Sequence, residues 1–213
     1  GYDQKPMLEL AGRLKKGEFD RVVITAMGAS TFGTYPAWLS LLRAGIPAFW
    51  MDTSELLGYA SSMITSRTIL WIVSNSGRII EATRLLSRME RSVSPFVLGN
   101  TNDLTSPLAQ EADLTIPMYT GNDVTLSTRS YLGTLAVNQL MARNLAGQTI
   151  ERELDDIRCT AQGLSDYLDQ FDTHLAELDE LVGPVDRLSI IGRGDSYATA
   201  MEGALCFKEG PKV

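Results

Sequence analysis

The sequence has little cysteine and histidine: among 213 residues there are two cysteines, Cys159 and Cys206, and one histidine, His174. Two such cysteines make neither a metal-binding pair nor a disulfide framework, and the carboxylates show no metal-ligand spacing. We therefore expect no metal, no cofactor and a reducing, cytoplasmic location. The longest strongly apolar run covers only residues 69–73, far short of the roughly 20 residues of a membrane span, so we expect no membrane association.

Positive charge is also scarce. The chain has 19 Lys and Arg against 26 Asp and Glu, a net charge of −7. No basic patch interleaved with aromatic residues occurs, so we expect no nucleic-acid partner. An anionic ligand would have to be attracted by local geometry, against the charge of the whole chain.

Short apolar runs alternate with segments of helical period in the first two thirds of the chain. We expect strands at residues 21–27, 46–51, 68–73, 95–99 and 113–118. Strands that alternate with helices favour a parallel sheet covered on both faces. The sequence therefore predicts an α/β fold, a doubly wound five-stranded parallel sheet over about residues 20–149, with the flavodoxin-like strand order 2-1-3-4-5.

A heptad pattern follows. From Ile150 to Val182, apolar residues recur at alternating spacings of four and three, which is typical of a helical seam. One helix of that length would extend for roughly 50 Å, so we expect a break near residues 171–173. A dimerising coiled coil is one interpretation; helices packed on their own chain are favoured, because the flanking charge pattern of a coiled coil is missing.

A strand–turn–helix pattern returns at residues 188–209 and echoes residues 22–42. In both segments an apolar strand leads through a glycine turn into a helix that contains tyrosine. We expect a first domain with an N-terminal helix (1–149), a helical linker (150–184) and the beginning of a second, similar domain (185–213).

Four small polar residues, Ser74, Asn75, Ser76 and Gly77, stand where the third strand meets a helix. Backbone N–H groups at a helix N-terminus, together with hydroxyl and amide donors, favour an anion such as phosphate. An ordinary helix cap with turn residues is the alternative. The segment has neither a P-loop lysine nor a Gly-x-Gly-x-x-Gly turn, which disfavours ATP and NAD.

The strand order places this turn at a reversal of winding. Ligands of open α/β sheets bind there, at the carboxyl ends of the strands. Two further hydroxyl-rich loops, residues 28–31 and 125–130, are expected to converge on the turn at 74–77.

These residues resemble the sugar isomerase (SIS) domain, in particular the isomerase half of glucosamine-6-phosphate synthase and related phosphosugar isomerases and deglycases. "SNSG" (74–77) is similar to that family's Ser-Gln-Ser-Gly-Glu-Thr turn. "GRGDSYATAMEGALCFKE" (192–209) is similar to its glycine turn and Glu-Gly-Ala-Leu-Lys-Leu-Lys-Glu helix. The resemblance covers residues from about 20 to 209.

The resemblance also implies roles for individual residues. Phosphate binding is implied for Ser74, Asn75, Ser76, Gly77 and Ile79. Sugar binding is implied for Ser30, Ser127 and Thr128. Glu209 would be the acid/base that moves a proton between sugar carbons 1 and 2. A homodimer with a small phosphosugar as its ligand is the implied assembly.

Three positions depart from the family pattern. Ile79 replaces a phosphate-binding threonine, for which Arg78 either compensates electrostatically or is simply solvated. Cys206 replaces a lysine, and a ring-opening histidine is expected after Glu209, whereas His174 lies in the linker. We therefore expect an isomerase, deaminase or deglycase acting on a sugar or amino-sugar 6-phosphate, with deglycation or deamination preferred. The alternative is a phosphosugar sensor without catalysis.

Overall fold

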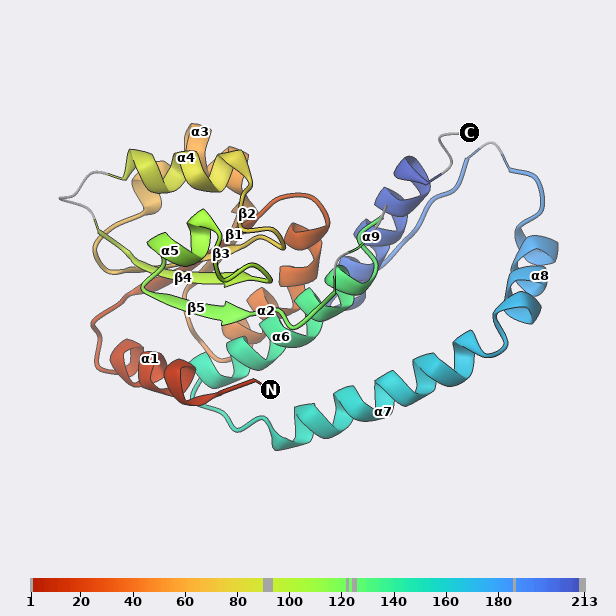
Figure 1. Cartoon of the computed structure of the whole chain (residues 1–213), viewed down its shortest axis with the longest axis horizontal. Coiled ribbons are helices and arrows are strands. Elements are labelled where there is room, and N and C mark those ends of the chain that lie inside the picture. The colour runs from red at the N-terminus through yellow and green to blue at the C-terminus, as the bar shows by residue number, and fades with distance from the viewer. Residues whose placement is uncertain (1, 90–93, 122, 124–125, 186, 211–213) are drawn as a thin grey trace.

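The computed structural model describes residues 2–89, 94–121, 123, 126–185 and 187–210 (Figure 1). Its centre is a five-stranded sheet in the order β2-β1-β3-β4-β5, with every pairing parallel. The strands are β1 (Arg21–Ala26), β2 (Ala48–Asp52), β3 (Thr68–Val73), β4 (Phe96–Thr101) and β5 (Leu114–Pro117). The predicted fold class and strand order are confirmed, and the strand ends lie within two residues of the prediction.

The sheet has a hydrophobic core on each face. Every residue of β3 is buried, and because successive side chains of a strand point to opposite faces, Trp71 joins one core while Leu70 and Ile72 join the other. Helices α1 (Lys5–Lys15), α2 (Ala29–Arg43) and α6 (Arg129–Leu145) cover the Trp71 face. The opposite face carries α3 (Thr53–Tyr59), the short η1 (Ser61–Met63), α4 (Ile80–Arg88) and α5 (Pro107–Glu111) (Figure 1).

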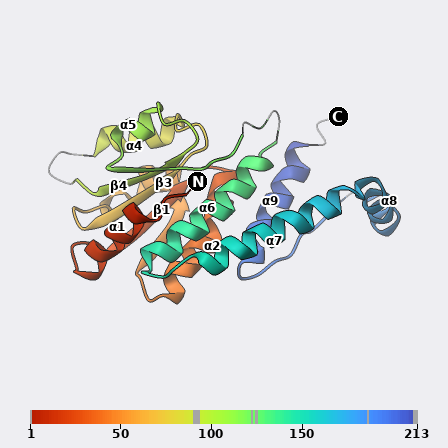
Figure 2. The same ribbon diagram turned by 60° about the horizontal axis from the view of Figure 1, so that its bottom comes forward.

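The heptad region forms two helices, α7 (Glu151–Leu168) and α8 (Phe171–Val182), and the break lies close to the predicted place. Neither helix contains a buried residue. On the seam, Leu164 is 39% exposed and Leu175 is 51% exposed, and both helices project away from the sheet (Figure 2). From Leu164 onward the seam is exposed, which contradicts the favoured interpretation that these helices pack on their own chain, whereas Ile150 at its start is 2% exposed.

The last segment is a helix without its expected strand. Helix α9 (Ser196–Glu209) forms as predicted, but residues 187–193 form no strand. A strand needs backbone partners, and the sheet ends at β2 and β5, so the apolar Ile191 remains 94% exposed. The division into two domains and a linker stays a prediction.

Helix α9 packs on α2 through aromatic and charged side chains. The rings of Tyr35 and Tyr197 lie 5.3 Å apart between centroids. Arg43, at the end of α2, donates to both carboxylate oxygens of Asp195 at 3.2 and 3.1 Å. Helix α9 is thus in direct contact with the α/β body, that is, the sheet with the helices that cover it.

Two features are absent from the described part of the chain. None of its helices is both long and apolar enough to cross a bilayer. No group of three or more His, Cys, Asp or Glu side chains within it is arranged to hold a metal ion.

Candidate functional site

The β3 tip, residues Ser74–Gly77, is a tight turn closed by its own hydrogen bonds. Gly77 N–H donates to Ser74 Oγ and to Ser74 O, both at 3.0 Å. The backbone of Gly77 has a φ of +63°, and a Cβ there would lie 2.1 Å from Ser106 Oγ. Both the left-handed backbone and the close approach of α5 therefore require glycine at this position.

A pocket of about 210 Å³ lies beside the β3 tip. Its walls come from the ends of β1 and β3 and from the start of α2, as expected for two loops that meet at a change in winding direction. The described residues that line it are Met27, Ser30, Val73, Ser74, Asn75, Ser76 and Ile79. None of these is charged, so a bound anion would rely on neutral donors and on the helix that follows.

Helix α4 begins at Ile80, after an extended residue, Ile79, at its N-cap. Ile79 makes no side-chain cap hydrogen bond, because an isoleucine has no acceptor to offer. The first N–H groups of a helix carry partial positive charge. The uncapped helix N-terminus next to the pocket therefore favours an anion.

The third expected loop does not line this pocket. Ser127 and Thr128 are absent from its lining residues, and Thr125 lies outside the described residues. The N-terminus of α6, which follows this loop, is instead capped by Asp123, whose carboxylate accepts the N–H groups of Arg129 and Ser130 at 3.0 and 3.1 Å and the Ser130 hydroxyl. Of the three loops, the structure brings two together.

Asp123 is a residue that the sequence reasoning missed. Its side chain is only 10% exposed. Burial alone would raise the pKa of Asp123, but the hydrogen bonds from Ser130 and Arg129 outweigh it and lower the pKa. The sequence carried one signal for this role: Asp123 stands a few residues before the predicted helix that follows Ser127 and Thr128. An acidic side chain close to a helix N-terminus can accept its free N–H groups.

Asn75 is anchored on the side of the tip that faces β4. Its backbone carbonyl accepts the Asn102 N–H at 3.0 Å and the Thr101 hydroxyl at 3.1 Å. Its side-chain oxygen accepts from Asn102 Nδ2 at 2.5 Å. This network ties the β3 tip to the end of β4 and the residue that follows it.

Arg78 is paired, which neither of the two interpretations had foreseen. Its Nη2 donates to Asp103 Oδ2 at 2.7 Å, and its side chain is 55% exposed. Hydrogen bonds from Thr105 and from Arg78 lower the pKa of Asp103 to about 2. The side chain next to the pocket is therefore neither a free cation nor simply solvated.

The candidate acid/base, Glu209, is exposed in the last turn of α9 and is absent from the residues that line the pocket. A methyl group at the adjacent Gly210 would lie 3.6 Å from Leu126 Cδ1, so the end of α9 approaches the loop that holds Ser127. Two turns earlier, Glu202 is 6% exposed and accepts from the Cys206 thiol at 3.8 Å. Burial raises the pKa of Glu202.

His174 lies on α8, at the end of the molecule far from the sheet (Figure 2). Its ring stacks on Tyr167, with centroids 4.1 Å apart. In this structure it packs on α7 and does not line the pocket at the β3 tip.

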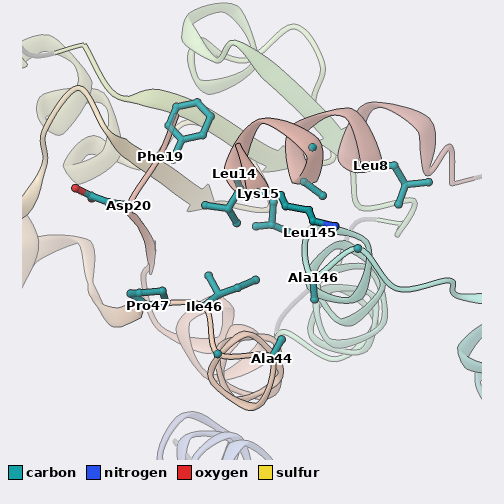
Figure 3. A pocket seen from close by; sticks show the side chains of 14 residues that line it. Leu8, Leu14, Lys15, Phe19, Asp20, Ala44, Ile46, Pro47, Leu145 and Ala146 are labelled. Atoms are coloured by element: carbon teal, nitrogen blue, oxygen red, sulfur yellow. The ribbon is translucent and has the colours of Figure 1, made fainter. Parts of the chain in front are cut away.

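A second pocket, of about 600 Å³, lies at the opposite edge of the sheet (Figure 3). Residues that precede β1 and β2, such as Phe19 and Pro47, line it together with α1 and the C-terminal ends of α2 and α6. Helix C-termini present carbonyl oxygens and partial negative charge. This pocket is larger, and its helix C-termini and Asp20 oppose an anion, although Lys15 also lines it.

Comparison with known proteins agrees with this arrangement. The chain is 26% identical over 197 residues, 90% of its length, to the isomerizing glutamine–fructose-6-phosphate aminotransferase of Pyrococcus horikoshii. The C-terminal domain of the glucosamine-fructose-6-phosphate aminotransferase of Francisella tularensis superposes with a TM-score of 0.80 at 20% identity, over 97% of this chain and 58% of that one. The fold is that of the sugar isomerase domain.

The sugar isomerase fold recurs in a proposed phosphosugar isomerase of Silicibacter pomeroyi, with a TM-score of 0.73 at 23% identity, over 96% of this chain and 62% of that one. The expected resemblance is confirmed by these relatives and neighbours. The chain spans about a third of the length of the curated relatives it matches, 33% for the Pyrococcus enzyme. No family model matches the chain.

Proposed function

We propose that the chain binds a sugar or amino-sugar 6-phosphate, with the phosphate in the pocket beside the β3 tip. One observation carries the proposal: neutral donors from Ser30, Ser74 and Ser76 line a pocket next to the uncapped N-terminus of α4. The curated relatives are named as glutamine–fructose-6-phosphate aminotransferases, and this name supports the same class of ligand.

The pocket takes the phosphate rather than the whole ligand. Its volume of about 210 Å³ lies below the roughly 300–1,000 Å³ of pockets that enclose drug-sized ligands. The sugar would extend beyond the pocket, and Ser127, Thr128 and the end of α9 are the contacts that we propose for it.

The chemistry that we propose is proton transfer between carbons 1 and 2 of the open-chain sugar. Glu209 would remove the proton from one carbon and return it to the other, as a carboxylate within hydrogen-bond reach can do. The approach of the α9 end to Leu126 supports a site shared between Glu209 and the Ser127 loop. The same step serves an isomerase, a deaminase or a deglycase.

Binding without catalysis is the second candidate. It is favoured by the exposure of Glu209 and its absence from the pocket lining, and by Cys206 in place of the family's lysine. A sensor would need only the phosphate pocket.

Thermal shift with a hexose 6-phosphate and with the free hexose tests the binding proposal. Ligand binding raises the free energy of unfolding by RT ln(1 + [L]/Kd). At a concentration of a hundred times Kd, the phosphorylated sugar should therefore raise the free energy of unfolding by about 2.7 kcal/mol. Ser76→Ala should reduce this gain in the free energy of unfolding, since Ser76 is exposed and lines the pocket, and the hydrogen bond that it loses, from the Arg78 N–H at 3.2 Å, lies in an exposed turn. Equal responses to the two sugars would refute phosphate recognition.

Turnover assays separate the two candidates. If Glu209 is the base, Glu209→Gln should reduce turnover of fructosamine or hexosamine 6-phosphates by about 10²- to 10⁴-fold while binding persists. Binding without any turnover by the natural sequence would favour the sensor.

A further inference from the structure

The Arg78–Asp103 ion pair holds a cation on the wrong side of the β3 tip for the proposed ligand. Asp103 follows β4, whereas Met27 and Ser30, which line the pocket, follow β1. Because β3 lies between β1 and β4 in the sheet, the pair and the pocket flank the tip on opposite sides. Arg78 itself is absent from the pocket lining.

Asp103 is built to stay in place. The N–H and hydroxyl of Thr105 donate to its Oδ1 at 2.8 and 2.6 Å, which leaves Oδ2 for Arg78. The low pKa of Asp103, about 2, keeps the carboxylate charged at neutral pH. Arg78 therefore pairs with a fixed partner rather than with a passing surface charge.

The guanidinium, in contrast, can be withdrawn from this pair. It is more than half exposed, and a single donor, Nη2, reaches Asp103. Exposed ion pairs are weak and screened by salt. A phosphate dianion has twice the charge of a carboxylate and accepts a bidentate contact from arginine, which makes it the stronger partner.

We propose that Arg78 contacts the phosphate when a ligand is bound. Without a ligand its guanidinium is paired with Asp103, and a dianionic ligand competes for it and moves it across the β3 tip. The inference rests on the proposed function and adds a determinant of affinity to it. Since the described pocket lining carries no charge, the competition between Asp103 and the ligand for Arg78 sets how tightly the phosphate binds.

Asp103→Asn tests this competition with little change of shape. Asparagine keeps Oδ1 for Thr105 and loses the charge that holds Arg78. Titration calorimetry at low salt should show the Kd for a hexose 6-phosphate lowered by about 1.4-fold to fivefold, the range that corresponds to release from an exposed ion pair. Asp155→Asn is the matched control, because Asp155 is an exposed aspartate paired to Arg158 at 2.6 Å, and it should leave the Kd unchanged.

A double-mutant cycle completes the test. Arg78→Gln should weaken binding, and Asp103→Asn should have no further effect in the Arg78→Gln background. A natural chain that binds the phosphosugar with a Kd that Asp103→Asn leaves unchanged or raises overturns this inference and leaves the proposed function standing. The same gain in both backgrounds also overturns it, since only the long-range field would be acting. Absence of phosphosugar binding by the natural sequence and by Asp103→Asn overturns both proposals.

Discussion

At the scale of single residues, Gly77 fixes the geometry of the candidate site. Its positive φ lets the chain turn back on Ser74, and its missing side chain lets α5 approach. Gly147 has a similar φ, +73°, but a Cβ there would meet nothing within 4 Å. An alanine at Gly147 would therefore meet only the unfavourable backbone conformation, whereas an alanine at Gly77 would also overlap with Ser106.

Gly77→Ala should destabilise the fold more than Gly147→Ala. Gly147→Ala should cost about 1 kcal/mol from the left-handed backbone. Gly77→Ala adds overlap with Ser106 and should cost about 1–3 kcal/mol more, the range for overpacking. Urea unfolding of both variants measures the difference, and equal losses would show that α5 moves aside freely.

At the scale of elements, the sheet was predictable and the side-chain pairings were not. The apolar runs at residues 21–27 and 68–73 specify buried parallel strands, and parallel strands bring their tips to one edge, which is why the loops at Ser30 and Ser74 meet as expected. The Arg78–Asp103 pair joins residues from different loops, so neither partner signals the other in the sequence. The expected strand at 188–192 failed because an apolar run does not supply its own hydrogen-bond partners.

The capping of α6 by Asp123 gives a prediction with a pH dependence. Asp123→Ala should lose about 0.5–2 kcal/mol at pH 7, the usual cost of removing a helix cap. The pKa of Asp123 is lowered from 3.8 in the folded chain, so its contribution is fully present above roughly pH 4 and is lost as the pH falls through the folded value. Urea unfolding at pH 7 and at pH 3 should show the difference between variant and natural chain shrinking in acid. A loss that is constant with pH would exclude the charged cap.

At the scale of the whole molecule, the apolar seam of α7 and α8 is unpartnered in this single chain. Its leucines from Leu164 onward, including Leu175, are exposed, and the heptad spacing suits a second helix. A homodimer that covers this seam is the assembly that we propose.

Sedimentation equilibrium should accordingly find a dimer of the natural sequence, and the double variant Leu164→Glu/Leu175→Glu should be a monomer. Charges placed on a seam repel across it and lose apolar burial. Gln162→Glu, which adds one charge to α7 outside the heptad spacing, should leave the dimer intact. A monomeric natural chain at high concentration would contradict the proposal.

The contact between α2 and α9 bears on the order in which the molecule assembles. Arg43 and Asp195 are 152 positions apart in the sequence, and the intervening helices α7 and α8 bury no residue. The α/β body can form its own cores before that distant contact closes, so we expect α9 to dock late in folding. Because loop-closure entropy grows only slowly with length, about 0.6 kcal/mol for each doubling, the intervening stretch is free to lengthen without loosening the docked helix.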